Sequence, residues 1–547
     1  MGVYLDPGYL SFEEAVNSNI YVDKSEMILF INSVVKTKQK YVSVSRPRRF
    51  GKSMAAEMLC AYYGREDSRF LFEQRKLAKK EGWDMYLGKF HVIRVVMTDF
   101  IKRNGSVGDG LLKMQRLIVR ELKKKYPDVD FFDTDDLIQS MLDVYAETEK
   151  QFVIVIDEWD AVFRLCKEAK EEQIVYLNFL RDWLKDKEYV ALAYMTGILP
   201  IKKYGEHSAL NMFYEYSMVA PMQLARYAGF TEEEVKELCE QFEMHYDEVS
   251  DWYDGYLISD RIPVDKRELY RQGDYHEQKI HIYSPLSVVN AISTGWIQNY
   301  WNNTETFEAL AEYIRRDFDG LKEATALLMD GGRVKVNLRR YQNDMTTFFS
   351  RDDVLALLIH LGYLGYDSET GEVFIPNKEI LEVFQDSTDN EEWEETFLAF
   401  RKSGELLQAT WECDEGKVAE LLEAAHDKAE NKTYHDEAAL SYAVQYAYYV
   451  AQKYYTTIKE LDTGRGYADL VYLPAPQYSD KPALLIELKY GRSAEEAVEQ
   501  IRGKKYLSEL EHYRGNILLI GINYDKDISS KGKGYKHHSC RIEKDEG

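Results

Sequence analysis

The tripeptide Gly51-Lys52-Ser53 stands between a β-branched run, residues 41–45, and a helical pattern, residues 53–63. A glycine, a lysine and a hydroxyl residue at a strand-to-helix junction can hold phosphates against the backbone N–H groups of the helix N-terminus. Lys52 would reach the β- and γ-phosphates, and the Ser53 hydroxyl would bind Mg²⁺. The stretch therefore predicts a site for ATP and Mg²⁺. We expect the loop contacts to come from Arg48, Arg49, Phe50, Gly51, Lys52, Ser53 and Met54.

The beginning of this loop departs from the usual pattern. Arg46 stands where such loops normally carry a glycine, and Pro47 has no backbone N–H to offer a phosphate. Only the last glycine is indispensable for the turn into the helix, and Gly51 is present. Residues 41–59 alone fit two interpretations, a working nucleotide site and a basic turn that contains the tripeptide by chance.

A second apolar run, residues 152–156, ends in Asp157 and Glu158. Asp157 can hold Mg²⁺ at the end of a strand, and Glu158 can orient or deprotonate the attacking water. Alone, an ordinary strand with a solvated acidic turn explains the pattern equally well; together with the tripeptide, it favours a nucleotide site. We expect this strand and the strand at 41–45 to be neighbours. Thr196 ends the next apolar run and could sense the γ-phosphate or cap a helix.

Acidic and basic residues also gather near the C-terminus, around two further apolar runs. Asp469 begins one predicted strand, and Glu487 and Lys489 lie on the next. Because side chains alternate along a strand, Glu487 and Lys489 share a face, while Leu488 points to the core. Two carboxylates and a lysine can bind Mg²⁺ at Asp469 and Glu487 and cleave a phosphodiester, with Gln500 on the following helix. A surface ion pair is the simpler interpretation of Glu487 and Lys489 alone.

The elements around these residues predict an α/β protein in three parts. Up to residue 225, apolar strands alternate with helices, which is typical of a parallel P-loop NTPase sheet covered on both faces. Residues 226–395 are mainly helical and end in a helix, a turn and a hairpin, the order of a winged helix. Residues 396–547 read as a helical stretch to Tyr455 and a separate small α/β unit, for which the resemblance described below implies a restriction-endonuclease-like fold. We place the domains at 1–225, 226–395 and 396–547.

The composition limits the classes of protein that remain. The net charge of −24 argues against non-specific binding of nucleic acid by the whole surface, although a local basic groove is compatible with it. The five cysteines are scattered without metal-site spacing and suggest reduced thiols. The N-terminus lacks the apolar core of a signal peptide, and no run is long enough to span a membrane. We therefore expect a cytoplasmic protein without a membrane partner.

Seven motifs together resemble the bacterial AAA-ATPase-like family, whose members commonly carry a C-terminal PD-(D/E)XK nuclease-like domain. They follow one another in that family's order. The motifs are YVDKSEMI (21–28), RPRRFGKS (46–53), VIVIDEWD (153–160), YMTGILPI (194–201), GFTEEEV (229–235), WYDGY (252–256) and YSPLSVVN (283–290). The resemblance implies that an arginine-rich loop is normal here, and it places Lys52, Ser53, Asp157 and Glu158 at the nucleotide positions. It also extends to STAND-like ATPases, in which the nucleotide sets a conformational switch.

At the C-terminus, the stretch from GRGYADLV to EEAVEQIRGKKY resembles the PD-(D/E)XK domain associated with this family. The resemblance implies a catalytic set of Asp469, Glu487 and Lys489, accompanied by Gln500 and Tyr506, with Glu437 as an upstream helical acid. The sequence thus predicts an ATPase that couples its nucleotide state to Mg²⁺-dependent cleavage of nucleic acid. The alternative is a signalling ATPase whose C-terminal domain binds a partner without cleavage. Arg181 and Arg226 are possible arginine fingers, and the oligomeric state stays open.

Overall fold

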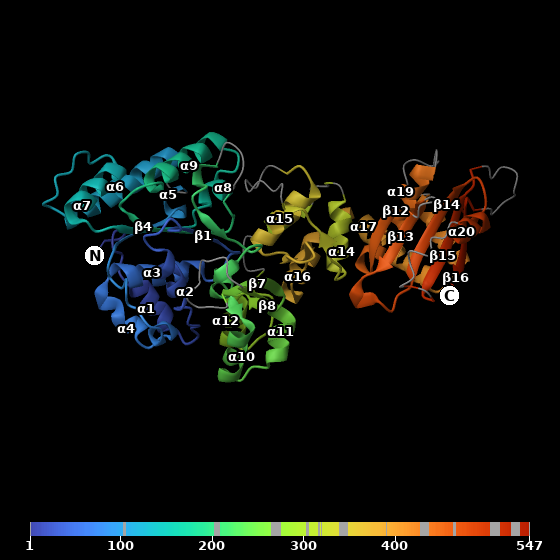
Figure 1. Ribbon diagram of the computed structural model, residues 1–547, viewed down its shortest axis with the longest axis horizontal. Coiled ribbons are helices and arrows are strands. Elements are labelled where there is room, and N and C mark those ends of the chain that lie inside the picture. The colour runs from blue at the N-terminus through green and yellow to red at the C-terminus, as the bar shows by residue number, and fades with distance from the viewer. Residues whose placement is uncertain are drawn as a thin grey trace. The chain divides into compact units, whose positions relative to one another are not determined.

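The computed structural model divides into two compact units (Figure 1). Unit 1 comprises Met1–Tyr313 and Lys335–Phe384, and unit 2 comprises Ile314–Val334 and Gln385–Gly547. The helical and winged-helix-like stretches thus fall largely in unit 1, whereas the boundaries 1–225, 226–395 and 396–547 stay predictions. The structure describes residues 2–101, 105–201, 208–263, 275–301, 306–314, 318, 320–338, 348–389, 391–426, 437–462, 467–503, 513, 515–526 and 536–545.

Five parallel strands form the main sheet of unit 1, in the order β2-β3-β4-β1-β5. Every residue of β1, β3 and β4 is buried, as expected for apolar strands covered on both faces. The parallel P-loop-type sheet that the sequence predicts is therefore present. The strands are β1 (Tyr41–Ser45), β2 (His91–Val96), β3 (Phe152–Asp157), β4 (Val190–Gly197) and β5 (Tyr214–Tyr216).

The prediction that β1 and β3 are neighbours is wrong, because β4 lies between them and pairs with both. Β4 has the most continuous apolar sequence of the sheet, and a fully buried position satisfies it best. The correction leaves the predicted site intact. Parallel strands bring their carboxyl ends to one edge of the sheet, so Ser45, Asp157 and Gly197 still end side by side.

Alternate residues of each strand face two different layers of helices. Val153 and Val155 pack with α1 (Leu10–Val16), α2 (Met27–Val34), α3 (Lys52–Gly64) and α4 (Arg69–Phe72). Ile154 and Ile156 pack on the other face, which Figure 1 shows beneath α6 and α9. The helices of that layer are α5 (Thr98–Ile101), α6 (Val107–Lys125), α7 (Leu137–Thr148), α8 (Ala161–Leu165) and α9 (Lys170–Leu184).

The following stretch of unit 1 combines helices with a small antiparallel sheet of order β6-β8-β7. Thr231 and Glu234 form the capping box that begins α10. The strands were not predicted, because their apolar residues are interleaved with charged ones and form no apolar run. The elements are β6 (Phe230–Thr231), α10 (Glu232–Gln241), α11 (Tyr246–Tyr253), β7 (Tyr256–Pro263), β8 (Tyr275–Tyr283), α12 (Pro285–Thr294) and α13 (Thr306–Ile314).

The predicted order of helix, turn and hairpin is present after residue 350. Ser350 and Asp353 cap the first helix, and Gly362 ends it with a positive φ of 92°. Asp367 and Glu372 then pair across the hairpin. The elements are β9 (Val334–Lys335), α15 (Arg351–Leu361), β10 (Gly365–Asp367), β11 (Glu372–Phe374) and α16 (Lys378–Thr388).

Unit 2 contains a mixed five-stranded sheet in which β14 and β15 are parallel and the other pairs are antiparallel. Three helices, α17–α19, cover one face of it and α20 covers the other. Tyr455, the predicted end of the helical region, begins the first strand. The helices are α14 (Leu321–Met329), α17 (Glu391–Trp411), α18 (Glu415–His426), α19 (Glu437–Ala447) and α20 (Ala494–Gly503). The strands are β12 (Tyr455–Asp462), β13 (Tyr467–Pro474), β14 (Ala483–Tyr490), β15 (Ile517–Tyr524) and β16 (His538–Lys544).

In the part of the chain that the structure describes, no helix combines the length and the apolar character needed to cross a bilayer.

Candidate functional site

The loop after β1 turns into α3 at Gly51. This residue has a φ of 80°, a left-handed conformation that favours glycine, and its carbonyl accepts the first helical hydrogen bond from Ala55. No atom lies within 4 Å of the position where a Cβ would stand. Gly51 is therefore required by the backbone conformation rather than by crowding, and it leaves open space in front of the helix N-terminus.

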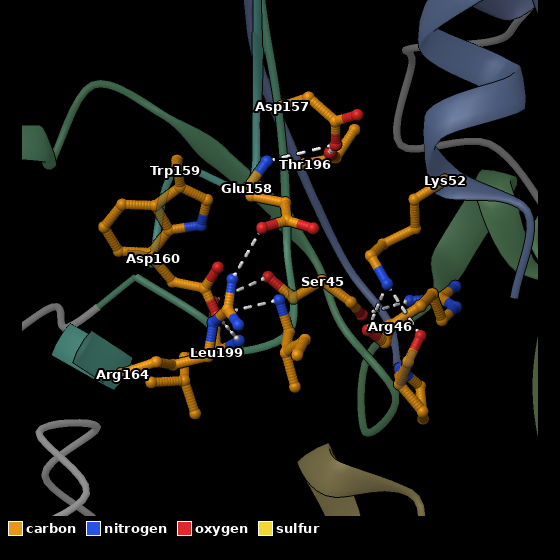
Figure 2. A network of polar contacts seen from close by, with 12 residues as sticks. Ser45, Arg46, Lys52, Asp157, Glu158, Trp159, Asp160, Arg164, Thr196 and Leu199 are labelled. Carbon is orange, nitrogen blue, oxygen red and sulfur yellow. Dashed lines mark hydrogen bonds and ion pairs between the residues drawn. The ribbon is translucent and has the colours of Figure 1, made fainter. Parts of the chain in front are cut away.

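Lys52 lies directly after this turn, at the first position of α3. Its Nζ donates hydrogen bonds to the carbonyl oxygens of Arg46 at 2.9 Å and Pro47 at 2.7 Å (Figure 2). Burial lowers the pKa of Lys52 to about 8, and the nearby carboxylates of Asp160 and Asp157 oppose this shift. An ammonium that donates to carbonyl oxygens of its own loop, with two carboxylates near it, is well suited to bind a phosphate.

Arg46 is the residue that replaces the usual glycine. Its side chain binds to strands of the sheet rather than to the loop. Its side chain is 1% exposed, and Nη1 donates to the carbonyl oxygens of Ser45 at 3.0 Å and Tyr216 at 2.8 Å. It thus links the ends of β1 and β5. Arg46 is not among the residues that line the cavity described below. Its side chain points into the interior, so it leaves the phosphate side of the loop clear.

Asp157 and Glu158 lie at the carboxyl end of β3, close to the end of β4. Asp157 is buried, and its Oδ1 accepts a hydrogen bond from the Thr196 hydroxyl and one from the Glu158 N–H at 3.0 Å. Both bonds fix the Asp157 carboxylate at the end of β3. Glu158 has a positive φ of 52° and is more exposed, with 41% of its side chain accessible. The backbone at Glu158 is therefore strained, and this strained conformation orients its carboxylate.

A buried acid and an arginine follow in the next turn of chain. Asp160 is fully buried, and its Oδ2 accepts hydrogen bonds from the backbone N–H groups of Ile198 at 3.0 Å and Leu199 at 2.9 Å. Arg164 donates from Nη2 to Glu158 Oε2 at 3.1 Å, and its Nε lies 3.4 Å from Asp160 Oδ2 (Figure 2). Burial lowers the pKa of Arg164, but Asp160 and Glu158 outweigh it and raise that pKa. The Glu158 carboxylate is therefore held by a cation of its own chain.

These groups meet in one cavity of unit 1, with a volume of about 880 Å³. This is within the range of about 300–1,000 Å³ that is typical of small-molecule sites. One part of its wall is polar and contains Lys52, Ser53, Asp157 and Glu158. Another part is apolar, as the planar base of a nucleotide requires. The apolar wall includes Phe12, Ile20, Tyr21, Val22, Met58, Tyr227, Phe230, Pro285, Leu286 and Val289.

The cavity contains nearly all of the residues predicted for the nucleotide. The whole stretch from Arg48 to Met54 lines it, together with Asp157 and Glu158. Thr196 does not line the cavity, but its hydroxyl donates a hydrogen bond to Asp157. Sequence reasoning missed Thr98, Asp160 and Arg164. The signal for the last two was the i, i+4 spacing of an acid and an arginine directly after the acidic strand end.

Neither of the arginines suggested as fingers is part of this wall. Arg181 lies on α9 beside Asp182 at 3.0 Å, and 42% of its side chain is exposed. Arg226 donates to Asp260, in a pair that lies outside the cavity lining. Arg164 is the arginine whose side chain enters the cavity beside the acids, with Arg48 and Arg49 on the loop.

In unit 2, the register of two antiparallel strands brings the predicted acids together. Leu470 on β13 pairs with Ile486 on β14, so Asp469 and Glu487, one position further along each strand, face each other. The Leu488 N–H donates to Asp469 Oδ2 at 2.7 Å. Leu488 itself is buried in the core, which confirms the predicted alternation.

Glu487 is surrounded by the other predicted residues of this site. It is 2% exposed, and its Oε1 accepts a hydrogen bond from the Gln500 amide and one from Lys489 Nζ at 3.4 Å. Gln500 reaches it from α20, which can approach because β15 carries Gly521 opposite Glu487. The structure therefore gathers Asp469, Glu487, Lys489 and Gln500 on one face of the sheet.

The donor set fits a magnesium ion. Mg²⁺ in nucleotide and phosphodiester chemistry is usually bound through one or two carboxylates and completed by water and substrate phosphate. Asp469 and Glu487 provide two carboxylates, and the described residues contain no group of three or more acidic, histidine or cysteine side chains arranged to hold a metal by themselves. Tyr506 and the side chain of Glu437 lie outside the described residues.

Comparison with known families matches two stretches of the chain. Residues 8–205 match the family described as predicted AAA-ATPase, and residues 439–533 match the PD-(D/E)XK nuclease superfamily. No curated protein matches the chain.

Two similar solved structures come from Aeropyrum pernix. The ORC2 protein, solved as ADPNP–ADP complexes, has 12% identity and a TM-score of 0.30, over 68% of this chain and 96% of its own. The ORC1 protein, solved in complex with DNA, has 10% identity and a TM-score of 0.24, over 66% of this chain and 91% of its own. At such low TM-scores, neither structure supports an argument about this chain. The family matches do: the chain joins an AAA-ATPase-like domain to a domain of the PD-(D/E)XK nuclease superfamily.

Proposed function

We propose that unit 1 binds and hydrolyses ATP. The observation that carries this proposal is the single cavity in which Gly51, Lys52 and Ser53 meet Asp157 and Glu158 from a distant strand. A basic turn with a chance tripeptide would have no reason to face two acids across a cavity of nucleotide size. The apolar residues of the lining support contacts to the base of a nucleotide.

Each polar residue has a role that its position supports. The Lys52 ammonium would leave the carbonyl oxygens of its own loop and bind the β- and γ-phosphates. The Ser53 hydroxyl and Asp157 would hold Mg²⁺, which, when bound, neutralises charge that develops on the phosphates. Glu158 would orient the attacking water and accept its proton.

We propose that the C-terminal domain cleaves nucleic acid at Asp469, Glu487, Lys489 and Gln500. Asp469 and Glu487 would hold Mg²⁺, which, when bound, polarises a phosphate oxygen. Lys489 would stabilise negative charge on the phosphate, and Gln500 keeps the Glu487 carboxylate oriented. In this proposal, the nucleotide state of the cavity controls cleavage, and the protein works in the cytoplasm on a nucleic-acid partner.

One observation favours a different function, a signalling ATPase that binds a partner without cutting it. Lys489 and Gln500 both donate hydrogen bonds to the same oxygen of Glu487, Oε1. The carboxylate therefore has partners within the protein without a metal ion. The net charge of −24 also disfavours broad contact with nucleic acid. The two functions differ in one respect that can be measured: only the nuclease loses an activity when Asp469 or Glu487 is replaced by alanine.

The ATP half is tested by nucleotide binding to the Lys52→Ala variant, measured by calorimetry. Because a hydrogen bond to a charged group contributes about 1.5–3 kcal/mol, we expect the Kd for ATP to rise about tenfold to a hundredfold. Lys79→Ala, at an exposed lysine remote from the cavity lining, should bind like the wild type. Equal ATP affinity in Lys52→Ala and wild type would contradict the proposal.

A further inference from the structure

Arg164 lines the cavity, but the ATP chemistry proposed above gives it no role. It lies on the short helix α8, directly after the acidic end of β3, and only 10% of its side chain is exposed. It nevertheless lines the 880 Å³ cavity. An arginine this deeply buried has lost most of its hydration, so its N–H groups need other partners.

The partners that it has do not use up its donors. A guanidinium carries five N–H groups. Among the described residues, Arg164 makes a hydrogen bond from Nη2 to Glu158 and a looser ion pair from Nε to Asp160 at 3.4 Å, and Nε has no hydrogen-bond partner. Nε is buried against Asp160, so the single hydrogen bond to Glu158 is the contact of this cavity-lining cation that a ligand can replace.

Asp160 and Glu158 restrain Arg164 to different degrees. Asp160 is fully buried and fixed by the Ile198 and Leu199 N–H groups, so it anchors one side of the guanidinium. Glu158 is 41% exposed and contacts Arg164 through one oxygen. The bond to Glu158 is therefore the one that a competing anion can replace, while Asp160 keeps the guanidinium in place.

We propose that Arg164 binds the terminal phosphate of the nucleotide and releases Glu158 when it does so. This inference rests on the proposed ATP site. Without nucleotide, Glu158 is the anion that satisfies Arg164; with a triphosphate, the terminal phosphate takes this place. Its oxygens suit a planar cation with several donors better than one carboxylate oxygen does. A nucleoside diphosphate has no γ-phosphate to reach Arg164, so the Arg164–Glu158 pair would stay closed.

Arg164 therefore couples two events within one chain. The contact distinguishes a triphosphate from a diphosphate, and it frees the Glu158 carboxylate only when the γ-phosphate is present. A purely structural arginine that orients Glu158 would affect hydrolysis but would leave the relative affinities for ATP and ADP unchanged.

The test measures ATP and ADP binding by calorimetry to the full chain and to the Arg164→Ala and Arg164→Lys variants. We expect the Kd for ATP to rise about tenfold or more, since charge-assisted bonds to phosphate are lost, while the Kd for ADP stays at the wild-type value. Unchanged ADP binding also shows that the variant is folded at the site. If Arg164→Ala does not fold, Arg164→Lys keeps the charge beside the buried Asp160 and should still lose part of the preference for ATP.

A second variant tests the exchange itself. Glu158→Gln removes the charge that competes for Arg164, so it should bind ATP more tightly than the wild type, and this gain should vanish in the double variant with Arg164→Ala. Arg181→Ala, at an exposed arginine on α9, is the matched control and should change neither affinity. An ATP-to-ADP affinity ratio that is unchanged in both Arg164 variants would overturn the inference and leave the ATP site standing. A wild-type chain that binds neither nucleotide would overturn both.

Discussion

At the scale of single residues, the proposed nucleotide binding depends on the charge of Lys52. Burial lowers the pKa of Lys52 to about 8, against 10.5 for an ordinary lysine, and the acids of the cavity oppose only part of this shift. A phosphate beside the ammonium favours the charged form and raises this pKa again. Binding must therefore be linked to protonation in the range above pH 8.

The sign of this linkage gives a prediction. Above pH 8, the free protein has lost the proton of Lys52 and must take it up again on binding ATP, so the affinity should fall by up to about tenfold per pH unit. Between pH 8.5 and 9.5, calorimetry in buffers of different ionisation enthalpy should detect uptake of nearly one proton. Lys52→Arg stays charged in this range and should bind without this proton uptake. Proton uptake that is the same in both proteins would assign it to another group.

The sequence predicts a site residue where the local spacing of residues fixes the direction of its side chain. Lys52 follows from its position at the start of a helix, Asp157 from a strand end and Glu487 from its place along a strand, because these positions fix where a side chain points. Arg46 does not, since its side chain turns into the sheet. The spacing of Arg164 from Asp160 indicates an ion pair, but not that Arg164 lines the cavity.

At the scale of elements, long apolar strands are predictable and alternating ones are not. The strands β3 and β4 appear as nearly continuous apolar runs, because both faces of the sheet are covered. By contrast, β7 and β12 mix polar with apolar residues, and such segments give only a weak signal within a helical context. The neighbours of each strand could not be predicted, because pairing order depends on contacts between residues far apart in the chain.

The contact between α20 and β15 positions the nuclease-like site and gives a prediction of its own. A Cβ at Gly521 would overlap the Ala494 carbonyl oxygen and lie 2.9 Å from the Cβ of Ala497. Gly521→Ala should therefore push α20 outward, remove Gln500 from Glu487, and destabilise the fold by about 1–3 kcal/mol. Urea unfolding measures the loss of stability, and the cleavage rate should fall with it.

The matched control is Gly503→Ala at the end of the same helix, where no atom lies within 4 Å of the added Cβ. Alanine should be tolerated there without loss of stability. A Gly521→Ala variant as stable and as active as Gly503→Ala would show that the close approach of α20 is not needed.

At the scale of the whole molecule, the chain combines two domains that each contain acids suited to Mg²⁺. Unit 1 contains the cavity with Lys52 and Asp157, and unit 2 contains the sheet face with Asp469 and Glu487. Two such sites in one chain suggest that one reaction controls the other. In the account proposed above, ATP is the control and cleavage of nucleic acid is the output.

The most direct measurement is the rate at which the full chain cleaves DNA and RNA with Mg²⁺ or Mn²⁺, with and without ATP. We predict cleavage that requires ATP, is lost in Lys52→Ala, and falls at least about a hundredfold in Asp469→Ala and Glu487→Ala, since several kcal/mol of charge stabilisation depend on these acids. Glu499→Ala, an exposed acid beside Gln500 on α20, should cleave like the wild type. Cleavage that is independent of ATP, or that persists unchanged in the Asp469 and Glu487 variants, would contradict the account.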